Sequence, residues 1–506
     1  MDRREFLKTG AAATVAGAAV SPGAEVVEAQ QAGSTALEHP KAQRPNLVFV
    51  VADQLRAASL PLYGETQIAT PHIDRLAREG VTLTNAVSTC PVCTPYRAML
   101  VTGRHPQTTG HLINSTRTRH SEISVGDAFA HQGYRTAWVG KWHLHTGVWP
   151  AQNVPDWVPK GRDRLGFQHW RAYNMHMVYF NGFVNGDDWN YEKWDGYETH
   201  ALNRYAFEFM DACGDDPFCL FLSPHQPHFT PFDFAPDDCY ARVAEKLELP
   251  ANVPDAMRGR ALTMYRHYLA MIVALDDMIG ELLDYLDRTR KARNTLVVFT
   301  SDHGTQAGSH GAKYPWSKKH PYEESMRVPC ILRLPGVLEG GVTRDTLTAP
   351  VDYFPSLCGL CGVPAPRSVE GYDLSDAWRG RSGAFEQEAV LTMNFSNKYD
   401  WFADGMEWRG VRTKRHSYDR WLDGPVELFD FENDPLEMNN LAERGQARSL
   451  RKEMEAMLRE LQAKRGDELV PCTQWANWLD HQRRVVRNAF GPLSDPEGEP
   501  DWSLLT

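Results

Sequence analysis

The sequence has few features that would assign it to a membrane, nucleic-acid-binding or repetitive class. The apolar stretch near its start is shorter than the roughly 20 residues that a membrane span needs, so we predict no membrane span. Asp and Glu (65) outnumber Lys and Arg (54), and no basic stripe is present, which argues against nucleic acid as a partner. Internal repeats and low-complexity segments are absent. What remains is a globular chain of 506 residues, long enough for more than one subdomain.

Cysteine is also scarce. The nine cysteines lie at 90, 93, 213, 219, 239, 330, 358, 361 and 472. This is too sparse for a disulfide scaffold, and no second cysteine pair with histidines completes a zinc pattern. Cys90 and Cys93 form one C-x-x-C pair, but nothing around it suggests a thioredoxin-like unit. A redox or zinc role for this pair is therefore an alternative that the sequence does not favour.

The N-terminus has the pattern of an export signal. Arg3 and Arg4 precede a modest apolar stretch, residues 9–20, and a small-residue site at residues 27–29. This order is typical of a twin-arginine signal with an A-x-A-like cleavage point, and an ordinary charged helix is the alternative. We therefore expect residues 1–29 to direct export to the periplasm or the medium, and residues 30–44 to form a polar linker.

Four apolar runs predict strands that are buried on both faces of a parallel sheet. They cover residues 46–51, 136–139, 218–222 and 296–300. Each run ends close to side chains that can bind metal or transfer a proton: Asp53 and Gln54, Lys141 and His143, His225 and His228, and Asp302 and His303. Ligands bind at the carboxyl ends of strands in open α/β sheets, so we expect one polar cluster rather than four unrelated turns.

The remaining periodicity completes a fold prediction. Apolar residues at helical spacing predict helices over 268–286 and 447–464, and short strands are expected at 389–393, 410–413 and 426–429. The predicted class is α/β, with a large, mixed, mostly parallel sheet sandwiched by helices over residues 45–384. A smaller C-terminal α+β subdomain is expected over 385–465, followed by an unassigned extension over 466–506.

Cys93 begins the most specific stretch of the sequence. Pro95, Arg97 and a Thr-Gly-Arg triplet at 102–104 follow it. Pro95 in a first helical turn would place Cys93 at a helix N-terminus, where free N–H groups and the helix dipole favour an anion. Arg97, one turn along, could then hold residue 93 and a bound oxyanion. The alternative is a buried structural cysteine that precedes a helix.

This stretch resembles the signature of the sulfatases, formylglycine-dependent enzymes of the alkaline phosphatase superfamily. Residues 140–143, 224–228 and 318–325 resemble further motifs of that family in the same order, within a resemblance that covers roughly residues 45–465. It implies a hydrolase that removes sulfate from carbohydrate or small aryl or alkyl sulfate esters. A phosphonate monoester or phosphodiester hydrolase of the same superfamily is one alternative. A non-catalytic binding protein with an unmodified Cys93 is the other.

The resemblance also implies the nucleophile. A formylglycine-generating enzyme would convert Cys93 to formylglycine, whose hydrated aldehyde attacks sulfur, forms a covalent sulfate ester and then releases sulfate. Tyr96 departs from the small Ser or Thr that is usual at its position, whereas Cys93, Pro95 and Arg97 keep the pattern. Modification of Cys93 is therefore expected.

Further catalytic roles follow from the resemblance for Arg97, Lys141, His143, His228 and Lys318. Lys141 would bridge sulfate and nucleophile, and His143 would orient or deprotonate residue 93. By spacing, His228 rather than His225 would contact the sulfate. Lys318 would act as a leaving-group acid or charge clamp, with Lys319 as its competitor.

The implied cofactor is one divalent metal ion. Its expected ligands are Asp53, Gln54, the modified Cys93, Asp302 and His303, an oxygen-rich set that suits a hard cation. Calcium is the usual ion of the family. Because Gln54 stands in the place of a second aspartate and offers a weaker field, manganese or magnesium is the alternative.

Aromatic residues are concentrated between positions 142 and 194. Six of them are tryptophans, namely Trp142, Trp149, Trp157, Trp170, Trp189 and Trp194. They could form a wall on which a sugar stacks. Large aromatic side chains more often pack in cores, so we expect core packing here.

Overall fold

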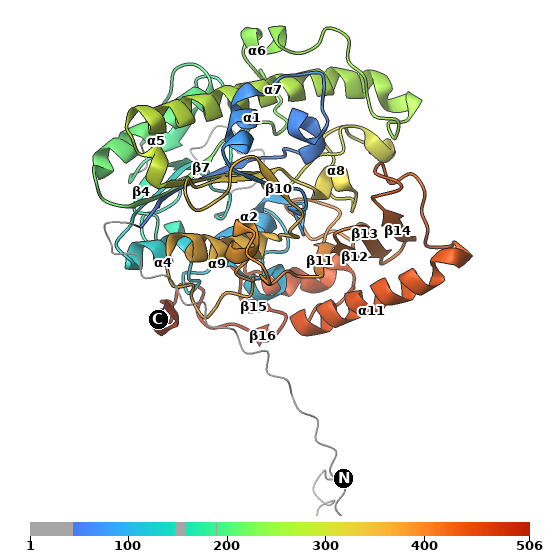
Figure 1. The fold of residues 1–506 in the computed structure, drawn as a ribbon. Coiled ribbons are helices and arrows are strands. Elements are labelled where there is room, and N and C mark those ends of the chain that lie inside the picture. Colours follow the sequence, from blue (N-terminus) through green and yellow to red (C-terminus); the bar gives the residue numbers. More distant parts are fainter. Residues whose placement is uncertain (1–43, 147–156, 189, 506) are drawn as a thin grey trace, which may run out of the picture. The chain divides into compact units, whose positions relative to one another are not determined.

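A ten-stranded mixed sheet runs through the part of the chain that the computed structural model describes, residues 44–146, 157–188 and 190–505 (Figure 1). Its strands, in spatial order, are β10 (Val342–Arg344), β2 (Val81–Leu83), β9 (Cys330–Arg333), β8 (Thr295–Ser301), β1 (Asn46–Ala52), β7 (Phe218–Ser223), β3 (Arg135–Lys141), β4 (His169–Tyr173), β5 (Phe183–Asn185) and β6 (Tyr191–Lys193).

The four apolar runs of the sequence are the four central neighbours β8, β1, β7 and β3. All three of their pairings are parallel, with Val48 opposite Leu220 and Val297, and Val139 opposite Leu222. Every residue of β1, β7 and β8 is buried, as expected for strands covered on both faces. The carboxyl ends of the four strands therefore meet at one edge of the sheet.

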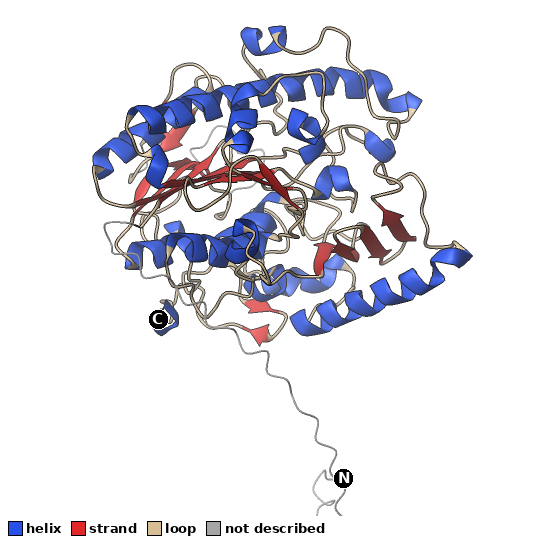
Figure 2. Cartoon of the chain, in the orientation of Figure 1, coloured by secondary structure: helices blue, strands red, loops and turns tan. Residues whose placement is uncertain are grey.

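Helices cover both faces of the sheet, as Figure 2 shows. Val48 and Val50 of β1 pack with α1 (Pro71–Arg78), α5 (Glu198–Cys213) and α7 (Asp255–Arg288). Leu47 and Phe49, which alternate with them, pack with α2 (Cys93–Thr102), α4 (Val125–His131) and α9 (Pro350–Cys361). The predicted α/β class is confirmed. Helix α7 begins 13 residues before the predicted position 268, because polar and charged residues dominate its first turns and hide the apolar period.

A four-stranded antiparallel sheet forms the C-terminal part. It contains β11 (Ala389–Asn394), β12 (Trp408–Thr413), β13 (His416–Trp421) and β14 (Val426–Asp430), in that order, and α11 (Arg448–Arg465) packs against it. Strand β13 was not predicted because its sequence, HSYDRW, is mostly polar. Residues after 466 add the short pair β15 (Arg487–Asn488) and β16 (Gly491–Pro492).

The C-terminal sheet shares a hydrophobic cluster with the large sheet's connections. Leu112 and Met326 belong to the same buried cluster as Trp408, Leu428 and Leu458. The architecture changes near the predicted boundary at residue 385, from the mixed sheet to the antiparallel sheet. That this boundary separates two domains stays a prediction. Short helices complete the described chain: α3 (Pro106–Thr109), α6 (Asp237–Ala241), α8 (Glu323–Met326) and α10 (Ser375–Arg379).

Two sequence predictions fall partly or wholly outside the described residues. The export signal over 1–29 and the linker up to residue 43 lie there, as do Trp149 and Trp189. Within the described ranges, Trp142, Trp170 and Trp194 are at most 2% exposed and belong to the core, as expected. Helices in the same ranges are too short or too polar to cross a bilayer.

Candidate active site

Cys93 is the first residue of helix α2, and it is buried at the carboxyl edge of the central strands. Val92 precedes the helix in an extended conformation, and Pro95 occupies the first turn, as its fixed φ allows. The Cys93 Sγ atom lies 3.2 Å from His303 Nε2, 3.3 Å from Lys318 Nζ and 4.0 Å from Asp53 Oδ1. The predicted nucleophile position is therefore surrounded by side chains from two strand connections, the one after β1 and the one after β8.

Arg97 joins the ends of all four central strands. Its guanidinium donates to Asp53 Oδ2 and Asp302 Oδ2 at 3.2 Å each, to the Lys141 carbonyl at 3.0 Å and to Ser223 Oγ at 2.9 Å. The side chain is fully buried, so each of these charge-assisted bonds lies away from water. Arg97 thereby fixes the spacing between the two carboxylates, one on each side.

Asp53 and Asp302 are fully buried carboxylates with different acidities. Burial alone would raise the pKa of Asp53, but Lys141 and Arg97 hold it well below its usual value. Burial and the charge of Asp53 raise the pKa of Asp302 to about 6. Two like charges this close disfavour each other, and a bound cation would relieve that repulsion.

The geometry of four side chains fits a hard divalent cation. Asp53, Cys93, Asp302 and His303 each place one ligand atom within 4.8 Å of the others, and all four are buried. His303 Nε2 is 3.4 Å from Asp302 Oδ1 and 3.8 Å from Asp53 Oδ1. His303 Nδ1 lies 2.9 Å from the Gly304 carbonyl, so it carries the proton and leaves the Nε2 lone pair facing the carboxylates.

Gln54 lies beside this group and contacts it through its main chain. Its backbone N–H donates to Asp302 Oδ1 at 3.1 Å, and its φ of 69° is left-handed. The side-chain amide nitrogen donates to Thr305 Oγ1 at 3.1 Å and to the Trp316 carbonyl at 2.9 Å. Gln54 thus orients Asp302, and its predicted role as a metal ligand stays a prediction.

Lys141 and three histidines form the wall next to Asp53. Lys141 pairs with Asp53, and its Nζ is 3.1 Å from His225 Nε2. The His228 ring lies 5.0 Å from that of His225, and its Nδ1 donates to the Phe229 carbonyl. The His143 carbonyl accepts from Thr94 Oγ1 at 2.7 Å, next to Cys93 in the chain.

The histidines of this wall are neutral. Burial, with the Asp53 charge opposing it only in part, lowers the pKa of His228 to about 3. Burial and the nearby Lys141 likewise lower the pKa of His143 and His225 well below the usual value. The Nδ1 atoms of His143 and His225 have no hydrogen-bond partner among the described residues, so both rings can still accept or donate one bond.

Lys318 and Lys319 point to different places. Lys318 Nζ lies 3.3 Å from Cys93 Sγ and 2.9 Å from His303 Nε2, over the ring of Tyr399. Lys319 also lies over the Tyr399 ring, but its Nζ donates to the main-chain carbonyl of Asn397 rather than to Cys93 or His303. The structure therefore places the predicted lysine at the cluster and its competitor outside it.

Sequence reasoning missed several members of the site. Both His225 and His228 follow the end of a buried strand, but spacing favoured His228 as the sulfate contact. In the structure, His225 contacts Lys141 directly. Ser223 is the last residue of a strand and carried no signal of its own. Asn114 accepts from the Thr94 N–H at 3.0 Å, and Tyr399 comes from the C-terminal part; only tertiary contacts reveal either.

The assembled site can bind an anion and stabilise charge on it. Arg97, Lys141 and Lys318 supply three cationic side chains against the carboxylates of Asp53 and Asp302, and a divalent ion would add to the excess. Burial raises the pKa of the Cys93 thiol, so an unmodified thiol at this position is neutral. The cationic surroundings suit a tetrahedral oxyanion ester whose negative charge is spread over several oxygens.

Comparisons with known proteins agree with this geometry. A family model described as "Sulfatase" matches residues 45–363, and one described as "N-sulphoglucosamine sulphohydrolase, C-terminal" matches residues 308–464. An "Ulvan-active sulfatase" from Formosa agariphila is 36% identical over 435 residues, which are 84% of this chain and 82% of the relative.

Two further similarities cover most of the chain. An "N-acetylglucosamine-6-O-sulfatase" from Bacteroides thetaiotaomicron is 24% identical over 522 residues, 84% of this chain and 87% of that protein. The solved structure of the "putative sulfatase yidJ" from Bacteroides fragilis has a TM-score of 0.76 at 28% identity, and the match covers 86% of this chain and 98% of that one. The similarity therefore includes both the large sheet and the C-terminal part.

Proposed function

This chain belongs to the sulfatase family and is a sulfuric ester hydrolase, and from that premise we propose that the sulfate it removes is carried by a carbohydrate. Two relatives support this substrate class: one is named for ulvan and the other for the 6-O-sulfate of N-acetylglucosamine. The reaction is R–O–SO₃⁻ + H₂O → R–OH + SO₄²⁻ + H⁺.

The observation that carries the proposed chemistry is the placement of Cys93 among Arg97, Lys141 and Lys318. Because its thiol is neutral where it lies, Cys93 is a poor nucleophile as encoded. We propose that a formylglycine-generating enzyme oxidises its Cβ to the aldehyde of formylglycine, with an oxidant that this enzyme uses, and that the sulfur leaves. The hydrated aldehyde supplies the attacking oxygen, and the three cations hold the ester oxygens in line with it.

The residues around position 93 have separable tasks in this proposal. Arg97 holds Asp53 and Asp302 apart, and Lys141 lies between Asp53 and His225. Neutral His143 can take a proton from the nucleophile, and His228 contacts the leaving oxygen. Lys318, whose Nζ lies 3.3 Å from Cys93 Sγ, offers a positive charge to the leaving group.

We propose one divalent ion held by Asp53, Asp302, His303 and the oxygen of the modified residue 93, with Gln54 in support. Two carboxylates suit Ca²⁺, and the weaker field of the Gln54 amide keeps Mn²⁺ or Mg²⁺ as the alternative. The ion supplies Lewis-acid charge stabilisation when bound. Export through the twin-arginine route would carry the folded, already modified enzyme to the periplasm or the medium.

A turnover panel tests the substrate class. Purified enzyme is assayed for sulfate release from sulfated oligosaccharides, 6-O-sulfated N-acetylglucosamine, and small aryl and alkyl sulfates. We expect kcat/KM to be highest on a sulfated carbohydrate. A small aryl or alkyl sulfate that exceeds every carbohydrate ester in kcat/KM would contradict the proposed class and leave the family assignment intact.

A further inference from the structure

A second group of ligand-type side chains lies outside the active site, and Glu437 is its most buried member. His310, Glu324 and Glu437 each place one ligand atom within 4.8 Å of the others, and His310 Nε2 lies 3.6 Å from Glu324 Oε2. His310 belongs to the connection after β8, Glu324 to α8, and Glu437 to the segment after β14. Three parts of the chain therefore converge on one point.

Asn252 approaches the same point from a fourth segment, just before α7. Its Nδ2 lies 2.5 Å from Glu324 Oε1 and 3.2 Å from His310 Nε2, so the amide faces the group. The residue is 5% exposed, and its Oδ1 has no hydrogen-bond partner in the described ranges. Because a half-turn exchanges the two ends of an amide, Asn252 can direct this oxygen at a cation.

The carboxylates carry unsatisfied oxygens as well. Glu324 Oε2 and Glu437 Oε1 are buried and accept no hydrogen bond from any residue that the structure describes. The two residues are 8% and 3% exposed. Leaving a buried polar atom without a partner costs about 1–3 kcal/mol, and more for a charged group. Three buried oxygens without a hydrogen-bond donor at one place indicate a bound cation, which accepts their lone pairs.

The negative charge of this group also favours a bound cation. Three carboxylates, those of Glu323, Glu324 and Glu437, gather here, and Glu437 Oε2 accepts from the Glu323 N–H at 2.7 Å. Arg412 already balances Glu323, with 2.8 Å between Nε and Oε1. Arg56 contributes a positive charge on the Glu324 side, and its Nε donates to Ser59 Oγ at 2.7 Å.

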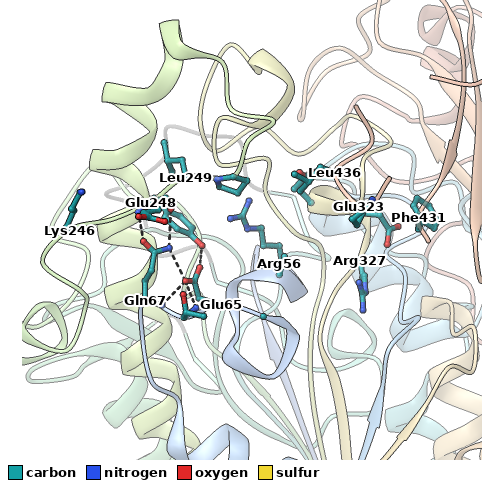
Figure 3. A pocket seen from close by; sticks show the side chains of 17 residues that line it. Arg56, Glu65, Gln67, Lys246, Glu248, Leu249, Glu323, Arg327, Phe431 and Leu436 are labelled. Atoms are coloured by element: carbon teal, nitrogen blue, oxygen red, sulfur yellow. Dashed lines mark hydrogen bonds between the residues drawn. The ribbon is translucent and has the colours of Figure 1, made fainter. Parts of the chain in front are cut away.

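A cavity gives an ion a route to this group. It has a volume of about 450 Å³ and is lined by Arg56, Glu323, Glu324 and Leu436 among others. Figure 3 shows Arg56, Glu323 and Leu436 on its wall. Glu324 is therefore accessible from the side of the cavity, and Glu437 follows Leu436 directly in the chain.

We propose that His310, Glu324, Glu437 and Asn252 bind a second divalent cation with a structural role. One imidazole with carboxylate and amide oxygens suits Mn²⁺ or Zn²⁺. The ion joins the connection after β8 to the C-terminal part. Lys318 lies between His310 and Glu324 in sequence. The ion therefore holds together the two ends of the segment that carries this active-site lysine.

Metal titration of the full-length protein tests the site. Chelator-treated protein is titrated with Mn²⁺, and separately with Zn²⁺, by calorimetry, together with Glu437→Gln, His310→Ala and Asp302→Asn variants. Glu443→Gln is the matched control, since its side chain is 88% exposed and outside the group. Circular dichroism checks that each variant is folded. If Glu437→Gln is not folded, His310→Ala takes its place in the comparison.

The proposal predicts a binding event for Mn²⁺ or Zn²⁺ that Glu437→Gln and His310→Ala weaken at least tenfold. Asp302→Asn and Glu443→Gln should leave that event unchanged. The same ion should raise the melting temperature of Asp302→Asn but not of the double variant that also carries Glu437→Gln. If neither cation shows a binding event sensitive to Glu437 and His310, the second site does not exist.

Discussion

At the residue scale, metal binding depends on Asp53 and Asp302. Asp302→Asn keeps the shape of the side chain but removes the charge, so a hard cation loses one strong ligand. We expect loss of the bound ion together with at least a hundredfold fall in kcat/KM, measured by metal analysis and sulfate release. Asp53→Asn should behave likewise, and Gln54→Ala should be milder. Full metal occupancy in either aspartate variant would place the metal site elsewhere.

The two adjacent lysines provide a matched pair of variants. Lys318 contacts Cys93 and His303, whereas Lys319 contacts the Asn397 carbonyl. We expect Lys318→Ala to lower kcat by about 10²–10³, the range for loss of one preorganised charge at a reacting centre. Lys319→Ala should change kcat by less than about threefold, the small effect expected of a residue outside the reacting centre. Equal losses in the two variants would refute the assignment of Lys318.

At the element scale, helix α2 holds the nucleophile position, and Asn114 satisfies one N–H of its first turn. Asn114→Ala should cost about 1 kcal/mol of unfolding free energy, as for loss of a helix cap, and should also lower kcat. Ser124→Ala is the control, because Ser124 caps α4 through the Asp127 N–H. It should cost a similar stability, measured by urea unfolding, without lowering kcat. A normal kcat in folded Asn114→Ala would mean that this bond does not position residue 93.

The predictable elements are those whose hydrophobic pattern can be recognised within a few consecutive residues. Uninterrupted apolar runs predicted β1, β3, β7 and β8, because strands buried on both faces need apolar side chains at every position. Strand β13 has alternating polar residues whose partners come from β12 and β14, so its own sequence did not reveal it.

The same distinction applies to the active site. Residues at strand ends, such as Asp53, Asp302 and Lys141, could be predicted because the parallel topology brings those ends together. Asn114 and Tyr399 could not, since each enters through a loop whose path depends on the packing of the whole chain. The choice of His228 over His225 depended on spacing alone, and the structure brings both rings to Lys141 and Asp53.

At the scale of the whole molecule, a protein with a net charge of −11 contains a buried cationic pocket. A sulfate monoester and a phosphate diester carry the same single charge, so ground-state attraction to the pocket discriminates poorly between them. A diester, however, replaces one free oxygen with an organic group. Losing one charge-assisted contact costs about 1.5–3 kcal/mol, or roughly one to two powers of ten in rate if it is lost in the transition state.

We therefore predict that kcat/KM for an aryl sulfate exceeds that for the matched aryl phosphodiester or phosphonate monoester by about 10–100-fold, with the slower reaction still detectable. Steady-state kinetics on esters with one common leaving group measure this ratio. A higher value for the phosphorus ester would assign this protein to the phosphonate and phosphodiester hydrolases of the superfamily.

The chemistry at residue 93 is the central proposal, and the mass of the peptide that contains it is its most direct test. The enzyme is produced with and without a formylglycine-generating enzyme, and each preparation is assayed for sulfate release and digested for mass spectrometry. The account predicts an aldehyde in place of the thiol, with specific activity proportional to the converted fraction, and no activity in Cys93→Ala. A fully active preparation in which residue 93 is an unaltered cysteine would contradict it.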